Sequence, residues 1–201
     1  YYKNGWGGNT NSMFLQKSYG SASDGCSSYY EGQWAEMAWN VTIYDKEALN
    51  NAVNSATGVH NSIYNYASYV TSNNYSAFTS ELNSARSLLT TRKTNQTAIN
   101  TQRTELINAI NALKFAADNT ALKNAINAAK AIKNESNYAL KYTAATRQAL
   151  ETALYNATDN TTYDTYVPTY SIDFSDNSTW NAGEKAAADQ SKINALTNAL
   201  T

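Results

Sequence analysis

The chain has 201 residues and a formal net charge of −1, because 15 Lys and Arg residues nearly balance 16 Asp and Glu residues. This length can bury a substantial core, whereas the near-zero charge makes nucleic acids and anionic membranes poor partners. A single His and a single Cys leave little for catalysis near neutral pH, which usually recruits these residues or a metal. We therefore expect no enzyme and no cofactor.

Uncharged polar and aromatic residues set the character of the surface. Only 15% of residues are charged, while the chain has 16 Tyr and 4 Trp. This combination suits neutral, hydroxylated ligands or broad contacts with proteins. No apolar run approaches the roughly 18 residues of a membrane span, so we expect no membrane insertion. Because the sequence begins at Tyr1 without Met or a signal-like segment, we expect a fragment of a larger protein, with its other modules as neighbours.

Residues 1–44 form the first section of the chain, and they are rich in aromatic residues in a Gly, Ser and Asn background. We expect an irregular segment that docks onto the rest of the chain. Trp6, which glycines flank, and Trp34 are candidate ligand-binding rings. The alternative is structural, because the spacing from Trp34 to Val41 suits one helical turn that packs inward.

An internal repeat begins at Asp45 and again at Asp118. Both positions start the pattern Asp-x-x-Ala-Leu-x-Asn-Ala. In each copy the Asp is placed to cap a helix whose apolar face then begins.

Two more anchors follow in the same order. The pattern Tyr-Ser/Thr-Ala-x-Thr begins at Tyr75 and at Tyr142, and it predicts a hydroxyl cap before the second helix of each unit. The pattern Ile-Asn-Ala-Ile/Leu begins at Ile107 and at Ile193, near the end of each unit. The two units therefore share one plan.

Apolar residues recur every three or four positions between the anchors, as amphipathic helices require. The runs are Leu49, Val53 and Ala56; Phe78, Leu82, Ala85 and Leu89; Ile99, Leu106, Ile110 and Leu113; Leu122, Ile126 and Ala129; Ala149, Leu150 and Leu154; and Ile193, Leu196 and Leu200. We predict an all-α fold of two three-helix-bundle repeats, residues 45–117 and 118–201, with the second carrying an insertion at 158–181.

These anchors resemble the short, FIVAR-like three-helix repeats found in tandem in large surface proteins of Gram-positive bacteria. The resemblance rests on Asp-x-x-Ala-Leu-x-x-Ala, the central Tyr-Thr-Ala and the closing Asn-Ala-x-x-x-Leu, and covers roughly residues 45–114 and 118–201. It implies an extracellular or cell-surface location. The overall style also resembles starch-adherence proteins of gut Firmicutes, which implies α-glucan as a ligand.

Departures from the repeat are where we look for function. The first unit runs 30 residues from Asp45 to Tyr75, against 24 from Asp118 to Tyr142, and the excess lies near Tyr64. The second departure is the 158–181 connection. Aromatic rings can lie against the C–H face of a sugar while amides and hydroxyls bind its oxygens. The predicted ligand-binding residues are Trp6, Trp34, Tyr163, Tyr166, Tyr170 and Trp180.

Other candidate chemistry is weaker. Residues 173–184 place oxygen ligands as in a calcium loop, but Ser178 stands where that loop needs glycine, and a helix cap near Asn181 explains them better. We therefore assign no metal site. His60 reads as a surface or capping residue, and Cys26 as an idle thiol.

The sequence thus predicts a non-catalytic carbohydrate-binding module of a bacterial extracellular protein, with a polysaccharide or oligosaccharide, most readily starch, as ligand. The rival hypothesis is an adhesin or superantigen-like module whose helix faces bind a host protein such as immunoglobulin or mucin. A third hypothesis is a stalk or spacer without a ligand.

Overall fold

The computed structural model describes Ser12–Met13, Trp39–Asn40 and residues 44–71, 73–91 and 94–201. The chain divides into two compact units, Tyr1–Tyr44 and Asp45–Thr201. In the first unit, β1 (Ser12–Met13) pairs antiparallel with β2 (Trp39–Asn40), so that Met13 lies opposite Trp39. Trp39 is therefore in a strand, whereas Trp34, Met37, Ala38 and Val41, on which the alternative of an inward-packing helical turn rested, lie outside the described residues.

The second unit is mostly helical, in agreement with the predicted all-α class. Its elements in chain order are α1 (Glu47–Ile63), η3 (Tyr64–Tyr69), α2 (Asn74–Thr90), α3 (Gln96–Asn111), β3 (Lys114–Phe115), α4 (Thr120–Lys133), α5 (Tyr138–Lys141), α6 (Ala144–Asp159), α7 (Thr161–Asp164), β4 (Tyr170–Ser171), η4 (Asn177–Thr179) and α8 (Ala182–Leu200). None of the described helices is both long and apolar enough to cross a membrane.

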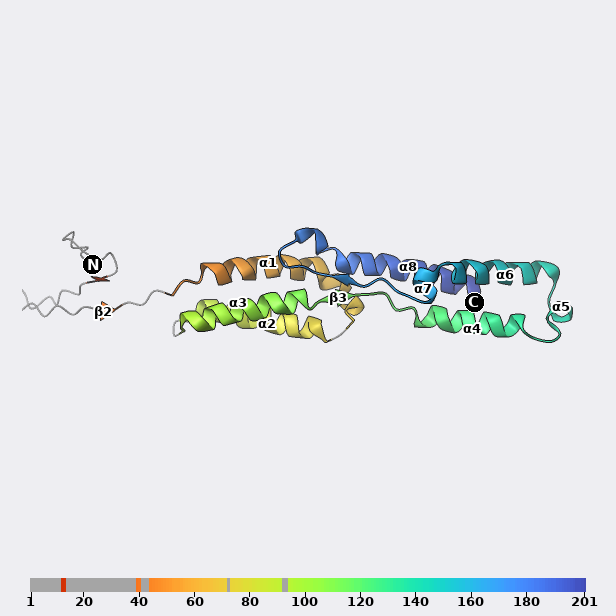
Figure 1. Ribbon diagram of the computed structural model, residues 1–201, viewed down its shortest axis with the longest axis horizontal. Coiled ribbons are helices and arrows are strands. Elements are labelled where there is room, and N and C mark those ends of the chain that lie inside the picture. The colour runs from red at the N-terminus through yellow and green to blue at the C-terminus, as the bar shows by residue number, and fades with distance from the viewer. Residues whose placement is uncertain (1–11, 14–38, 41–43, 72, 92–93) are drawn as a thin grey trace, which may run out of the picture. The chain divides into compact units, whose positions relative to one another are not determined.

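Helices α1, α2 and α3 pack against one another, and we call them the first helix group (Figure 1). Their inward residues follow the predicted three- and four-residue spacing. The buried residues are Leu49, Ala52, Val53, Ala56, Val59 and Ile63 on α1, Phe78, Leu82 and Ala85 on α2, and Ile99, Leu106 and Ile110 on α3. Periodic apolar residues thus place one stripe of each helix in a shared core.

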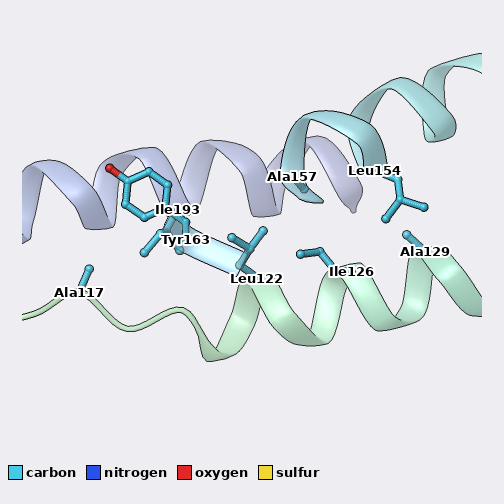
Figure 2. Packing of buried hydrophobic residues seen from close by; sticks show 8 residues of the cluster. All are labelled: Ala117, Leu122, Ile126, Ala129, Leu154, Ala157, Tyr163 and Ile193. Atoms are coloured by element: carbon cyan, nitrogen blue, oxygen red, sulfur yellow. The ribbon is translucent and has the colours of Figure 1, made fainter. Parts of the chain in front are cut away.

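Helices α4, α6 and α8 form the second helix group in the same way. Figure 2 shows its core, in which Leu122 and Ile126 of α4 face Leu154 and Ile193. Ala149 was predicted to face this core, but its side chain is exposed. The inward stripe of α6 instead runs through Leu150, Leu154 and Ala157, which lie three or four residues apart.

Asp45 and Asp118 were predicted to cap α1 and α4, but the N-caps of these helices are Lys46 and Asn119, one residue later. Asp45 Oδ1 accepts a hydrogen bond of 2.8 Å from the amide of Glu47, and Asp118 Oδ1 accepts one of 2.8 Å from the amide of Thr120. Each carboxylate therefore satisfies the first free amide of its helix. Hydrogen bonds from the hydroxyl and amide of Thr120 lower the pKa of Asp118.

The two predicted hydroxyl caps differ in outcome. Thr143 is the N-cap of α6, and its Oγ1 accepts a hydrogen bond of 3.2 Å from the amide of Thr146. Ser76 was predicted to cap the second helix of the first unit, but α2 already begins at Asn74, so Ser76 lies inside the helix. The prediction of a hydroxyl cap there is wrong.

The two departures from the repeat contain regular structure. The excess of the first unit coincides with η3, which has 6 residues, and the 158–181 connection contains α7, β4 and η4. β3, in the segment that links the two helix groups, pairs antiparallel with β4, and Phe115 also bridges to Val70. The linking segment is therefore held by hydrogen bonds on both of its sides.

Candidate functional site

An amide side chain fastens the start of the first helix group. The side chain of Gln96, at the start of α3, accepts a hydrogen bond of 2.9 Å from the amide of Asp45 and donates one of 3.0 Å to the carbonyl of Asp45. It also donates to Asn100 Oδ1, at 3.1 Å. We call this set of bonds the entry latch, because it ties the residue before α1 to the third helix of the group.

The second helix group has the same latch. Gln190 accepts from the amide of Asp118 at 2.7 Å, donates to its carbonyl at 3.1 Å, and donates to Asn194 Oδ1 at 3.0 Å. Ile193, three residues after Gln190, therefore matches Ile99, which lies three residues after Gln96. The predicted pairing of Ile107 with Ile193 is wrong by about two helical turns.

The residue after each latched Asp donates a hydrogen bond to another part of the chain, at the end of α2 in the first helix group and in α7 next to the second. Lys46 Nζ donates to the carbonyls of Leu88, Leu89 and Thr91 at 3.1, 2.9 and 2.7 Å, and so caps the end of α2 with a cation. At the equivalent position Asn119 Nδ2 donates to the carbonyl of Tyr163 at 2.8 Å. The first entry segment is therefore bonded to α3 and to the end of α2, and the second is bonded to α8 and to α7.

A buried carboxylate organises the 158–181 connection. Asp189 of α8 is 5% exposed, and its two oxygens accept hydrogen bonds from the hydroxyls of Tyr163, at 2.6 Å, and Tyr170, at 2.7 Å. Lys192 Nζ lies 4.0 Å from Asp189 Oδ1. Two tyrosines of the connection thus donate hydrogen bonds to one side chain of α8, and these bonds hold the connection against that helix.

The same carboxylate changes how these tyrosines ionise. Burial, followed by the hydrogen bond to Asp189, raises the pKa of Tyr163 to about 12. The hydrogen bond to Asp189, followed by burial, raises the pKa of Tyr170 to about 12. Both hydroxyls stay protonated and remain hydrogen-bond donors at neutral pH, as a structural clamp requires.

Two glycines let aromatic rings pack between the helix groups. A methyl group added at Gly183 of α8 would lie 2.5 Å from Tyr66 Cβ in η3. One added at Gly58 of α1 would lie 3.0 Å from the Trp180 ring. Together with the β3–β4 pairing, these contacts form what we call the joint between the first and second helix groups. At Gly183 any side chain would require the neighbouring Tyr66 to shift, and at Gly58 the Trp180 ring would have to give by a few tenths of an ångström.

The predicted ligand-binding residues differ in how far the structure exposes them. Tyr163 is only 5% exposed and belongs to the core of the second helix group (Figure 2), so its ring is not available to a ligand, and that prediction is wrong. Tyr170 is half-buried with its hydroxyl held by Asp189, and Trp180 is half-buried at the joint. Tyr166 is 64% exposed.

The other candidate residues are Trp6, Trp34, Cys26 and the residues of the calcium-like segment 173–184. Trp6, Trp34 and Cys26 lie outside the described residues. In the calcium-like segment, Asp173 Oδ1 accepts hydrogen bonds from the amide and hydroxyl of Ser175, which lower the pKa of Asp173. Within the described ranges, no group of three or more His, Cys, Asp and Glu side chains could hold a metal ion.

A shallow groove of about 960 Å³ runs between α2 and α3. Hydroxyl and amide side chains line most of it, among them Ser84, Ser87, Thr101 and Gln102. No aromatic residue of the described part of the chain belongs to its lining. The groove therefore lacks the flat apolar face on which the carbohydrate hypothesis depends.

Sequence reasoning missed Gln96 and Gln190 of the latches and Gly58 and Gly183 of the joint. A signal for the latches was present, because Gln-x-x-Ile-Asn occurs at Gln96 and again at Gln190. Asp189 carried a weaker signal, as a carboxylate at a core-facing helical spacing from Ala186 and Ile193.

Comparison with known protein families, with curated proteins and with solved structures found no match.

Proposed function

We propose that the chain is a non-catalytic spacer module of a bacterial extracellular protein, in which two three-helix repeats are fastened into one rigid unit. The proposal rests on the two segments that depart from the repeat, because both of them pack between the helix groups. Both η3 and the 158–181 connection contribute to the joint, through Tyr66 on Gly183 and Trp180 on Gly58. Segments that lock neighbouring repeats together serve a mechanical role.

The duplicated hydrogen bonds support the repeat itself. The latches at Asp45 and Asp118 match bond for bond, and the following residues, Lys46 and Asn119, both donate to the segment at the end of the second helix. In repeat proteins each unit packs against its neighbour, and these contacts fix the distance between successive units. The resemblance to tandem surface repeats is consistent with this role.

Distance measurements between spin labels test the rigidity of the joint. In a Cys26→Ser background, labels at Ser80→Cys on α2 and Thr152→Cys on α6 report on the two helix groups, and both positions are exposed. We expect a narrow distance distribution. The double variant Tyr66→Ala/Trp180→Ala removes the rings at the joint and should broaden it.

A matched control removes two rings of comparable type from the surface. Tyr155 and Tyr166 are 63% and 64% exposed, and their double replacement by Ala should leave the distribution narrow. A broad distribution in the unsubstituted chain would show that the helix groups hinge freely, and the spacer proposal would be abandoned.

Carbohydrate binding at the predicted residues is a second candidate, which the exposure of Tyr166 favours. We expect a pull-down on insoluble starch to retain the chain and the Tyr166→Ala variant to be retained less. Equal retention of the two proteins, or none of either, would remove Tyr166 from the candidates. The host-protein hypothesis stays a prediction.

A further inference from the structure

A group of aromatic rings lies where α1, η3 and α2 meet. The ring centroid of His60 on α1 is 5.7 Å from that of Tyr64 on η3 and 6.2 Å from that of Tyr75 on α2, and the His60 and Tyr75 rings are stacked at 23°. Phe78 lies 6.2 Å from His60 and 6.4 Å from Tyr75. Three successive elements therefore bring their rings together.

Exposure separates this group from the aromatics of the joint. Tyr64 is 64% exposed, His60 and Tyr75 are half-buried, and Phe78 is fully buried. Phe78 thus supports the other rings from the core side. Tyr66, only two residues after Tyr64, packs on Gly183 instead, so one short helix serves the joint with one ring and presents another at the surface.

The polar atoms at this surface suit hydroxyl groups. Tyr75 Oη and His60 Nε2 lie 3.5 Å apart and can act as donor and acceptor. Burial and the neighbouring Tyr64 raise the pKa of Tyr75, so its hydroxyl stays protonated at neutral pH. Asn61 and Asn65 are exposed beside His60 and Tyr64 in the sequence.

The local charge favours an uncharged ligand. Residues 48–80, which cover most of α1, all of η3 and the start of α2, contain no Asp, Glu, Lys or Arg. Arg86 of α2 donates to Thr57 Oγ1 of α1 at 2.9 Å, so this cation is engaged by a hydroxyl of the chain itself. A charged peptide or a phosphate would find little to pair with on these elements.

We propose that His60, Tyr64 and Tyr75 form a binding platform for a neutral saccharide. The C–H face of a sugar ring would lie on Tyr64, and the hydroxyls of the sugar would bind Tyr75, His60 and the nearby amides. The platform lies within the first helix group and differs from every residue predicted to bind a ligand. It does not rest on the spacer function, because it needs no particular arrangement of the joint.

Titration of the isotope-labelled full chain with oligosaccharides, followed by NMR, tests this proposal. The panel contains maltoheptaose, cellohexaose, mannohexaose and xylohexaose, which are all neutral and differ in sugar and linkage. We expect at least one of them to shift the amide signals of His60, Tyr64 and Tyr75 with a saturable dependence on concentration. The Tyr64→Ala variant should bind roughly threefold to tenfold more weakly, as the loss of one aromatic contact implies.

Tyr155→Ala is the matched control, since Tyr155 of α6 is 63% exposed and Tyr64 is 64% exposed. Its affinity should equal that of the unsubstituted chain. The proposal is overturned by a panel without saturable shifts at the platform, or by an equal loss of affinity in the Tyr64→Ala and Tyr155→Ala variants. Neither result would alter the spin-label distances, so failure of this site and failure of the spacer function are distinguishable.

Discussion

The side chain of Gln190 binds both backbone polar groups of Asp118, with hydrogen bonds of 2.7 Å from the Asp118 amide and 3.1 Å to the Asp118 carbonyl. These residues are 72 positions apart in the sequence. Gln96 binds Asp45 in the same way across 51 positions. In each helix group these two hydrogen bonds join the residue before the first helix to the last helix. We therefore expect them to stabilise both groups.

Replacement of Gln190 by Ala should lower the free energy of unfolding by about 1–2 kcal/mol, because two hydrogen bonds to the backbone are lost. Gln96→Ala should have an effect of similar size. Urea denaturation followed by circular dichroism measures both changes. Gln148→Ala, at an exposed position of α6, is the control and should change stability by less than about 0.5 kcal/mol. A control effect as large as the other two would argue against the latch.

Asp189→Ala should be more damaging, at about 3–5 kcal/mol, because it leaves the buried hydroxyl of Tyr163 and the partly buried hydroxyl of Tyr170 without their charged acceptor. Lys192→Ala is the comparison, since this side chain is 64% exposed at 4.0 Å from Asp189 and such pairs contribute less than about 1 kcal/mol. Chemical denaturation of the two variants side by side provides the measurement. Similar losses in both would mean that the ion pair, rather than the tyrosines, holds Asp189.

Alkaline pH should destabilise the fold through Tyr163 and Tyr170. Both have a pKa of about 12 in the folded chain, against an ordinary value of 10.0. Below pH 10 both states hold the protons, whereas above it the unfolded chain releases them first. The free energy of unfolding should therefore fall as the pH rises from about 10 to about 12, which a series of urea titrations across that range would measure.

The Asp189→Asn variant checks the cause of those pKa values. The hydrogen bond to Asp189 is the largest contribution for Tyr170, whereas burial is the largest for Tyr163. We therefore expect the substitution to lower the pKa of Tyr170 more than that of Tyr163. Site-resolved NMR titration of the tyrosine ring carbons distinguishes the two residues. The opposite order would contradict this assignment of causes.

Gly183→Ala should destabilise the chain, although Ala normally favours a helix over Gly by about 1 kcal/mol. The reason is the added methyl group, which would lie 2.5 Å from Tyr66 Cβ. Thermal unfolding of Gly183→Ala, Tyr66→Ala and the double variant forms a cycle in which the second substitution relieves the first. Strictly additive losses would show that Gly183 and Tyr66 do not contact each other.

The sequence by itself determined the helical class and most of the core-facing residues. Apolar spacing placed Leu49, Phe78, Leu122 and Ile193 correctly, because a helix repeats its faces every 3.6 residues and this period is local. The positions of Asp45 and Asp118 before their helices were also predictable, since capping depends on neighbouring backbone amides.

Only the tertiary structure decided what the aromatic residues do. Tyr163, Tyr166 and Tyr170 look alike in sequence, yet Tyr163 is in the core, Tyr166 is exposed and Tyr170 is half-buried, and only Tyr163 and Tyr170 bind Asp189. The difference depends on α8, which begins after these residues in the chain and supplies Asp189. Burial and hydrogen bonding arise from residues that are distant in sequence, and local periodicity carries no information about which distant residue a ring will meet.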